Sequence, residues 1–123
     1  MDAIEQEIQD KGLTAPRVTP ADIEANIASE HYFTADEGCT GQAWGEKDDD
    51  DLVIAARDGL PEALSLLTFC VLVLRNGFTV TGESACASPE NFDAELGCKI
   101  ARQHAISKVW PLMGYALKEK LNG

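Results

Sequence analysis

The chain has 123 residues, of which 45% are hydrophobic and 25% are charged, and its formal net charge is −11. This length and balance predict one globular domain over residues 1–123 and exclude an intrinsically disordered chain. Residues 1–58 hold fifteen acids and four bases, whereas residues 59–123 hold six of each, so we expect no direct binding of nucleic acid by the whole surface.

The sequence predicts neither a membrane span nor a metal centre. No run of about 18 apolar residues is present, and the acidic start lacks the features of a signal peptide, so we expect a cytoplasmic protein. The cysteines form no Cys-x-x-Cys pair, and no histidine stands at zinc-finger spacing. We expect the four cysteines to be reduced and mostly packed, and we expect no cofactor.

Two helices are predicted near the amino terminus. The first covers residues 1–11. The second begins clearly, because Thr19 suits the N-cap, Pro20 suits the first helical position and Asp22 completes a capping box. This second helix is expected to continue to about Glu30 or His31.

Residues 36–60 are predicted to form an acidic loop region, since glycines and the run Asp48 to Asp51 interrupt the apolar pattern. The acidic run is interpreted as a solvated loop. A divalent-cation site is the alternative, but the run lacks the spacing of a calcium-binding loop, with its central glycine and terminal glutamate.

The strongest local pattern predicts an antiparallel β-hairpin over about residues 68–86. Two β-rich runs flank Asn76-Gly77, a pair that favours a two-residue type I′ turn. This turn would pair Val73 with Val80 and Val71 with Gly82, and it would leave the first strand apolar on both faces. An alternative treats PEALSLLTFCVLVL as a helix that ends at Gly77, although its β-branched and aromatic residues favour a strand.

A long C-terminal helix is predicted next, with Ser88 as its N-cap and Pro89 in its first turn. Gly97 inside the helix predicts close packing against another element. Pro111 predicts a kink or a break. The expected buried stripe consists of apolar residues at near-helical spacing, namely Phe92, Leu96, Ile100, Ile106, Trp110, Met113 and Leu117.

These elements together predict an α+β fold. A lone two-stranded hairpin is marginal in water, so either segments before residue 60 add strands or a second copy of the chain covers the sheet. We favour a homo-oligomer.

The segment after the hairpin contains residue types that occur in catalytic sites. Ser84 and Cys86 could act as nucleophiles, but His104 lies about 24 Å along the helix from Ser88, too far for a direct pair. Carboxylates such as Glu83 and Glu90 have a simpler role near a helix start. We therefore predict no catalytic residues.

A binding function has more support, because the start of a helix offers free backbone N–H groups and the positive end of its dipole. Bases on the same helix and nearby aromatic rings would suit a small nucleotide-like ligand. The alternative is that these rings are core and these bases are solvated. The candidate ligand-binding residues are Tyr32, Ser84, Ser88, Asn91, Lys99, Arg102, Lys108, Trp110 and Tyr115.

The segments LRNGFTVTGESACASPENFDAELGCKIARQHA and SKVWPLMGYALKEKL, together with the earlier VTPADIEANIASEHYFTADEG, resemble a family of small tailed-phage proteins labelled gp forty-nine or gene sixty-six. The resemblance implies a phage or prophage origin and action in the cytoplasm of an infected host. It supplies no catalytic residues, and it favours a non-enzymatic function directed against the host.

Three hypotheses follow. The first is an oligomeric binder that interferes with host defence by sequestering a nucleotide-derived signal. The second is an acidic inhibitor or DNA mimic that captures a host protein, as the charge of −11 favours. The third is an enzyme acting on a nucleotide or a peptide.

Overall fold

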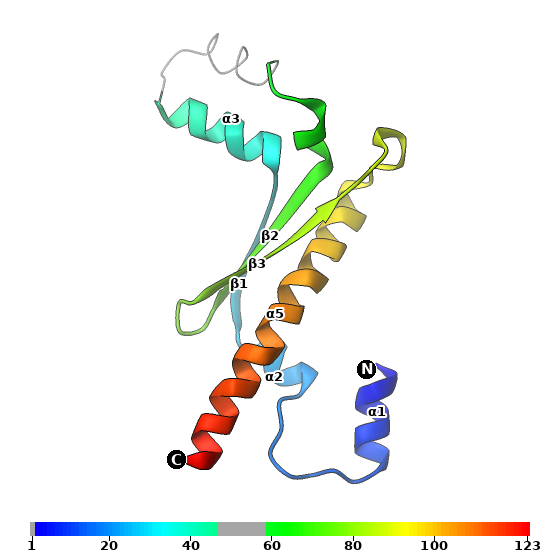
Figure 1. Cartoon of the computed structure of the whole chain (residues 1–123), viewed down its shortest axis with the longest axis vertical. Coiled ribbons are helices and arrows are strands. Elements are labelled where there is room, and N and C mark those ends of the chain that lie inside the picture. Colours follow the sequence, from blue (N-terminus) through cyan, green and yellow to red (C-terminus); the bar gives the residue numbers. More distant parts are fainter. Residues whose placement is uncertain (1, 47–58) are drawn as a thin grey trace.

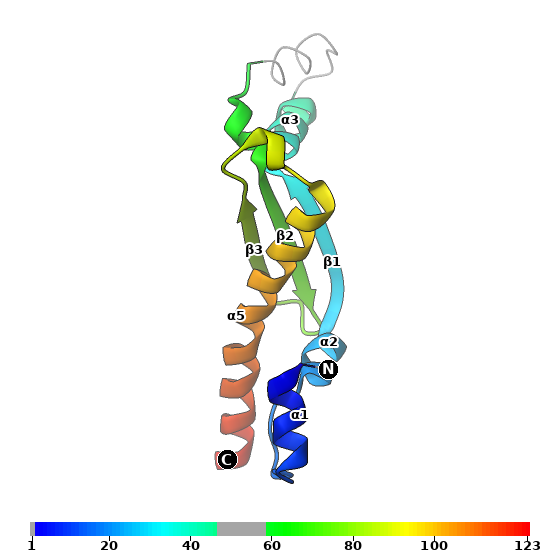
Figure 2. The same cartoon turned by 90° about the vertical axis from the view of Figure 1, so that its right-hand side faces the viewer.

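The computed structural model describes residues 2–46 and 59–123. Strands β1 (Ile27–Thr34), β2 (Leu67–Leu74) and β3 (Thr79–Ala85) form an antiparallel sheet in the order β1-β2-β3. Helix α5 (Ala94–Asn122) crosses one face of this sheet and extends well beyond it (Figure 1, Figure 2). The predicted α+β class, with helices at the amino terminus and a long helix at the carboxyl terminus, is confirmed.

The remaining helices lie at the two ends of the sheet (Figure 1). Helices α1 (Ala3–Asp10) and α2 (Pro20–Ala25) are at the end towards which the carboxyl-terminal half of α5 points. Helix α3 (Ala35–Glu46) and the 3-10 helix η1 (Glu62–Leu66) are at the opposite end. A second 3-10 helix, η2 (Pro89–Asn91), precedes α5.

The capping box predicted for α2 is confirmed. The Thr19 hydroxyl accepts a hydrogen bond from the Asp22 N–H at 3.1 Å, and the Asp22 carboxylate accepts one from the Thr19 N–H at 2.9 Å. The predicted end near His31 is wrong, because α2 ends at Ala25 and β1 follows. Pairing of residues 27–34 with β2 overrides the four-residue spacing of Ile23 and Ile27, which is typical of one helix face, as tertiary contacts often override local propensity.

The predicted loop region is also wrong in its first part, because residues 35–46 form α3. Thr34 stands before this helix, and its N–H donates to the Glu37 carboxylate at 3.1 Å. Asp36 and Glu37 lie in the first turn, where the helix dipole favours negative charge. The run Asp48 to Asp51 and the rest of residues 47–58 lie outside the described residues, so the solvated-loop and cation-site interpretations stay predictions.

The β2–β3 hairpin is confirmed, and the alternative helix over its first strand is wrong. Its register differs from the predicted one by one residue, since Val80 lies opposite Leu72 rather than Val73. A type I′ turn requires a positive φ at Asn76, but among the described residues only glycines have one. The loop instead has three residues, closed by Gly77 with φ of 91° and by a hydrogen bond from the Leu74 N–H to the Phe78 carbonyl at 2.8 Å.

This change of register moves the side chains of β3 to the other face relative to those of β2. The face towards α5 carries Cys70, Leu72, Leu74 and Val80, all of which are buried. The intervening residues of β2 are only half-buried, so the predicted burial of this strand on both faces is wrong. On the opposite face Phe33 stacks on Phe69, with ring centroids 5.4 Å apart.

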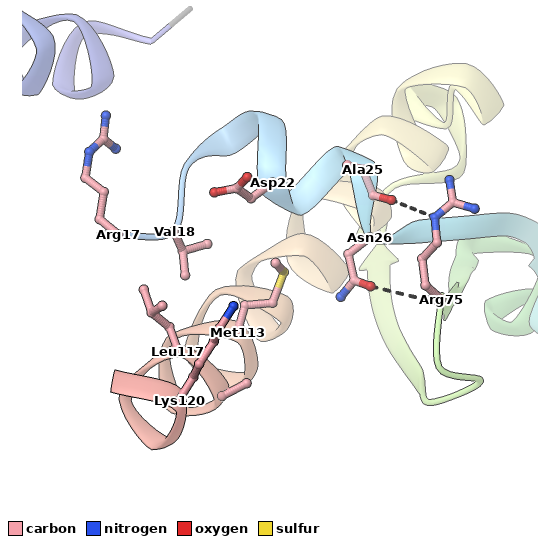
Figure 3. A pocket seen from close by; sticks show the side chains of 10 residues that line it. Arg17, Val18, Asp22, Ala25, Asn26, Arg75, Met113, Leu117 and Lys120 are labelled. Carbon is pink, nitrogen blue, oxygen red and sulfur yellow. Dashed lines mark hydrogen bonds between the residues drawn. The ribbon is translucent and has the colours of Figure 1, made fainter. Parts of the chain in front are cut away.

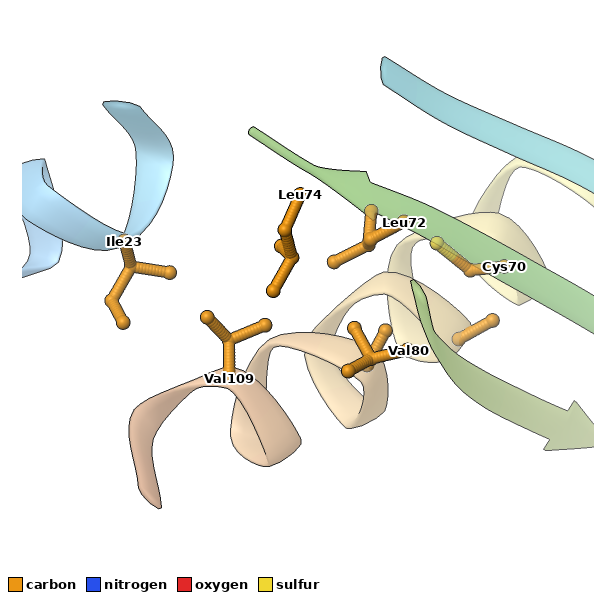
Figure 4. Close-up of a cluster of buried hydrophobic side chains, with 8 residues drawn as sticks. Ile23, Cys70, Leu72, Leu74, Val80 and Val109 are labelled. Carbon is orange, nitrogen blue, oxygen red and sulfur yellow. The ribbon is translucent and has the colours of Figure 1, made fainter. Parts of the chain in front are cut away.

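The core lies between β2, β3, α2 and α5 (Figure 4). Helix α5 contributes a face of small residues spaced four apart, namely Gly97, Ala101, Ala105 and Val109. The predicted stripe of large residues is wrong at Leu96, which is 53% exposed, and at Trp110, which is 36% exposed. Ile106 and Met113 do pack against the core, although both are only partly buried.

Close packing of α5 on the sheet is confirmed at Gly97. A Cβ atom there would lie 3.0 Å from Thr68 Oγ1. The approach is closer still at Gly82 of β3, where a Cβ atom would lie 2.1 Å from the Ala101 carbonyl oxygen. The small face of α5 therefore allows the helix backbone to lie almost against the strand.

Two predictions about α5 itself are wrong. The N-cap is Asp93, whose carboxylate accepts from the Leu96 N–H at 3.0 Å, whereas Ser88 makes no side-chain cap. The predicted break at Pro111 is absent, because α5 continues through this residue. The proline removes the helical donor for the Ser107 carbonyl, but both residues are exposed, so water can satisfy that carbonyl.

Candidate ligand-binding site

A cavity of about 280 Å³ lies between the end of β3 and the start of α5. It contains two of the predicted ligand-binding residues, Ser84 and Asn91. Its walls come from η1, the end of β3, the segment around η2 and the first two turns of α5. The lining residues are Leu66, Ser84, Ala85, Cys86, Ala87, Asn91, Phe92, Asp93, Leu96, Gly97 and Ile100.

Backbone hydrogen bonds fix the segment that brings Asn91 beside Ser84. The Cys86 N–H donates to the Leu66 carbonyl at 3.0 Å and so continues the sheet past β3. Ser88 is extended, as a residue before proline usually is, and its carbonyl accepts from the Asn91 N–H at 3.0 Å. The chain therefore reverses over residues 88–91 and returns to the end of β3.

The cavity presents polar groups that are free to bind a ligand. Within the described part of the chain, neither the Ser84 hydroxyl nor the Asn91 side-chain amide makes an intramolecular hydrogen bond. The amide provides two donors and an acceptor, and the hydroxyl provides one donor and an acceptor. Phe92 adds an aromatic ring to the same wall. This combination suits a flat heteroaromatic group with polar edges.

The electrostatics of the cavity do not favour an anion. Among the described residues no lysine, arginine or histidine lines it, and Asp93 places a carboxylate on its wall. This carboxylate also accepts a hydrogen bond from the Leu96 N–H in the first turn of α5. The predicted free helix start at Ser88 therefore does not exist, because the helix begins five residues later with its own acidic cap.

A buried hydroxyl lies next to this cavity. Thr68 faces Ser84 across β2 and β3, and it is 2% exposed. Its Oγ1 atom has no hydrogen-bond partner in the described structure and lies beside Gly97, which lines the cavity. Unpaired buried hydroxyls cost free energy, so this atom is a candidate contact for a bound polar group or water.

Two of the other predicted binding residues, Tyr32 and Arg102, belong to a separate cluster. The Arg102 guanidinium donates to both oxygens of Glu24 at 3.0 and 2.7 Å and to Glu30 at 3.2 Å, so α5 is joined to α2 and β1. The hydrogen bonds from Arg102 lower the pKa of Glu24, and those to Glu24 raise the pKa of Arg102. Arg102 is thus committed to protein carboxylates.

Tyr32 joins this cluster by donating its hydroxyl to Glu30 at 2.9 Å. Burial is the main cause that raises the pKa of Tyr32, and the hydrogen bond to Glu30 adds to it. Burial also raises the pKa of the neighbouring Cys70 thiol. Both groups are therefore neutral at physiological pH.

The remaining predicted binding residues lie along α5, away from the cavity. Lys99 pairs with Glu95 at 3.3 Å on the exposed surface. Lys108 and Trp110 are exposed further along the helix, and Tyr115 is 71% exposed at a distance of about 33 Å from Asp93 along the axis. Ser88 does not line the cavity, although its carbonyl shapes the adjoining turn.

Two of the residues considered for catalysis, Cys86 and His104, make structural hydrogen bonds. The His104 Nδ1 atom lies 2.6 Å from the Glu83 carbonyl oxygen, and the Cys86 thiol donates to the Ser88 carbonyl at 3.2 Å. Among residues 2–46 and 59–123, no group of three histidines, cysteines or carboxylates is placed to hold a metal ion. No helix in these ranges has both the length and the apolar character that a membrane span requires.

The comparisons with known proteins identify the family. The family model described as "Phage protein (N4 Gp49/phage Sf6 gene 66) family" matches residues 18–121. The chain belongs to this family. The match covers the three strands, most of α5 and every residue that lines the cavity, and it confirms the resemblance found in the sequence. Comparison with curated proteins and with solved structures gave no match.

Most of the residues that line this cavity were not among the ligand-binding residues predicted from the sequence. Leu66 was not predicted because it comes from η1, about twenty residues before Ser84, and only the sheet brings the two together. Phe92, Leu96 and Ile100 were assigned to the core stripe of the helix. These three residues stand four apart directly after Ser88-Pro89, and this spacing was the available signal.

Proposed function

We propose that this phage protein acts by binding rather than by catalysis, and that it interferes with host defence in the host cytoplasm by sequestering a nucleotide-derived signal. The observation that carries the proposal is the cavity in which the Ser84 hydroxyl and the Asn91 amide are free and adjacent to Phe92. The polar edges of a nucleobase can form hydrogen bonds with Ser84 and Asn91, and its flat face can stack on the ring of Phe92.

The cavity would hold the base and ribose rather than the phosphates. Its volume of about 280 Å³ is at the lower end for small-molecule sites, and the described residues of its wall include a carboxylate and no basic side chain. Phosphate groups would therefore extend away from Asp93 into solvent or towards a second subunit.

A homo-oligomer is part of the proposal. The sheet face opposite α5 leaves Phe33 37% exposed and Val71 and Val73 only half-buried. Strand β3 is an edge of the sheet and carries the residues that lead into the cavity. A second copy that covered this face or this edge would bury apolar area and could enlarge the site.

Calorimetry against a panel of cyclic dinucleotides and cyclic ADP-ribose variants tests the proposal. We expect at least one member of the panel to give saturable heat and a rise in melting temperature. Ser84→Ala and Asn91→Ala are each expected to weaken that binding by about tenfold, as loss of one neutral hydrogen bond does. Absence of heat and of any thermal shift across the panel would count against it.

The matched control is Gln103→Ala, which changes an exposed polar residue of α5 outside the cavity. We expect this variant to bind like the wild type. Analytical ultracentrifugation of the unmodified chain tests the oligomer separately, and a stable single subunit at micromolar concentration would remove that part of the proposal.

A second candidate is an acidic inhibitor or DNA mimic that captures a host protein. Its support is the net charge of −11 and the concentration of acids before residue 59. Replacing Asp48 to Asp51 with asparagines should then abolish capture of the host protein from lysate, while the cavity variants should leave capture unchanged. Unchanged capture after the replacement of the four aspartates would exclude this candidate.

A further inference from the structure

A larger cavity, of about 500 Å³, lies at the other end of α5, between that helix and α2 (Figure 3). It is separate from the Ser84 cavity and shares no residue with it. Its apolar surface comes from Val18 on one side and from Met113 and Leu117 of α5 on the other. This volume is in the range of small-molecule sites.

The two walls of this cavity carry opposite charges. Asp22 lies on the α2 wall and Lys120 on the α5 wall. Figure 3 shows the Lys120 amine directed from α5 towards α2, and the Asp22 carboxylate on the opposite side of the space, beside Val18. In the described part of the chain they are not within ion-pair distance of each other, and Lys120 makes no ion pair with any other carboxylate. Each charge is therefore available to a ligand.

The remaining polar groups of the cavity have defined partners. One oxygen of Asp22 accepts from the Thr19 N–H, which leaves its other oxygen without a hydrogen bond in the described structure. Asn26 turns its Oδ1 atom to the Arg75 N–H at 3.4 Å, so its amide N–H₂ faces the space above Met113 (Figure 3).

The two arginines at the cavity are already engaged. Arg17 pairs with the buried carboxylate of Glu5 at 2.7 Å and points away from the space (Figure 3). This pairing is the main cause that raises the pKa of Arg17, with a smaller contribution from Asp22. The Arg75 guanidinium donates to the Ala25 carbonyl at 2.7 Å. Figure 3 shows the Arg75 guanidinium beside Ala25, on the side away from Met113 and Lys120, so a simple anion between the helices would meet the Lys120 amine and the opposing Asp22.

We propose that this cavity binds a small zwitterion with an apolar side chain, that is, an apolar α-amino acid or a dipeptide of such residues. The ligand's ammonium group binds Asp22. Its carboxylate binds Lys120 and the amide of Asn26. Its side chain packs on Val18, Met113 and Leu117. A plain cation would face Lys120, and a plain anion would face Asp22, so only a ligand with both charges satisfies both walls.

Calorimetry with L-leucine, L-phenylalanine and leucyl-leucine tests the site. We expect saturable binding of at least one of them. N-acetyl-leucine lacks the ammonium group, 3-methylbutylamine lacks the carboxylate and glycine lacks the side chain. Each of these three probes is expected to bind at least tenfold more weakly than the tightest zwitterion.

Two variants assign the binding to this cavity. Asp22→Asn removes the charge but keeps an oxygen that can cap Thr19, and Lys120→Gln removes the opposing charge. Each is expected to weaken zwitterion binding at least tenfold, and Lys118→Gln, an exposed neighbour that does not line the cavity, is expected to have no effect. Melting curves for all three verify that the variants are folded.

Three results would overturn the inference: no binding of any zwitterion at millimolar concentration, N-acetyl-leucine binding as well as L-leucine, or full binding by the folded Asp22→Asn and Lys120→Gln variants. Neither variant touches the Ser84 cavity, so both should bind the nucleotide panel as the wild type does. Failure of this inference is therefore distinguishable from failure of the proposed function.

Discussion

Replacement of Gly82 by alanine should be among the most destabilising single-methyl additions in this protein. The added Cβ would lie 2.1 Å from the Ala101 carbonyl oxygen and 2.3 Å from the Ala105 nitrogen. Both are backbone atoms of α5, so no side-chain rotation relieves the contact, and strand and helix must separate by about 1 Å. That separation opens the core at two alanines that are fully buried.

We expect Gly82→Ala to lower the free energy of unfolding by about 3 kcal/mol or more, because overpacking that moves the backbone lies at the upper end of its usual range. For a domain of this size, that corresponds to a melting temperature lower by about 12 °C. Urea and thermal denaturation followed by far-UV circular dichroism measure both quantities.

Two glycines of α5, Gly97 and Gly114, provide matched controls. A Cβ at Gly97 would lie 3.0 Å from Thr68 Oγ1, a side-chain atom that can rotate. This contact should lower the free energy of unfolding of Gly97→Ala by about 1 kcal/mol, and the higher helix propensity of alanine should raise it by about as much. Gly114 is exposed, with nothing within 4 Å of its Cβ position, so Gly114→Ala should stabilise by up to about 1 kcal/mol. Equal stabilities for all three variants would refute the close approach of β3 to α5.

Three further predictions concern single side chains. Arg102→Gln should lower the free energy of unfolding by about 1 kcal/mol at neutral pH. Because Arg102 lowers the pKa of Glu24 from its ordinary 4.5, this contribution is full above that value and is lost as the pH falls through the folded-state pKa, so urea melts at about pH 3 should show a smaller difference. Pro111→Ala should raise the melting temperature, since the helix regains a backbone donor worth about 1–3 kcal/mol; an unchanged value would contradict this. Thr68→Val should stabilise by about 1 kcal/mol by removing an unpaired buried hydroxyl, and a loss of stability would show that this hydroxyl has a partner.

The hairpin shows which part of the fold was predictable from sequence. The alternation of apolar residues around Gly77 located both strands correctly. The register was not predictable from the turn dipeptide, because Arg75 is held by long-range hydrogen bonds to Ala25 and Asn26. These contacts keep Arg75 inside the loop, so the loop has three residues and every side chain of β3 moves to the other face.

The face of α5 was mispredicted for a related reason. Hydrophobic periodicity gives most weight to large residues, and it selected a stripe through Leu96 and Trp110. In the fold, Leu72, Leu74 and Val80 of the sheet already fill the space between the layers. Only small residues fit opposite them, so the helix turns its glycine and alanine positions inward and leaves Leu96 and Trp110 exposed.

The position of the helix N-cap decides what the candidate site can hold. Ser88-Pro89 and Asp93-Ala94 are both acceptable cap sequences, and local propensity does not choose between them. The choice depends on the Cys86 N–H reaching the Leu66 carbonyl, a contact with η1 that fixes the turn over residues 88–91. Because that turn uses Ser88, the helix has its N-cap at Asp93, and its first turn carries a carboxylate in place of N–H groups that are free for an anion. Binding of an isolated nucleoside as tightly as its phosphorylated form would support this assignment, whereas tight binding of inorganic phosphate at the Ser84 cavity would contradict it.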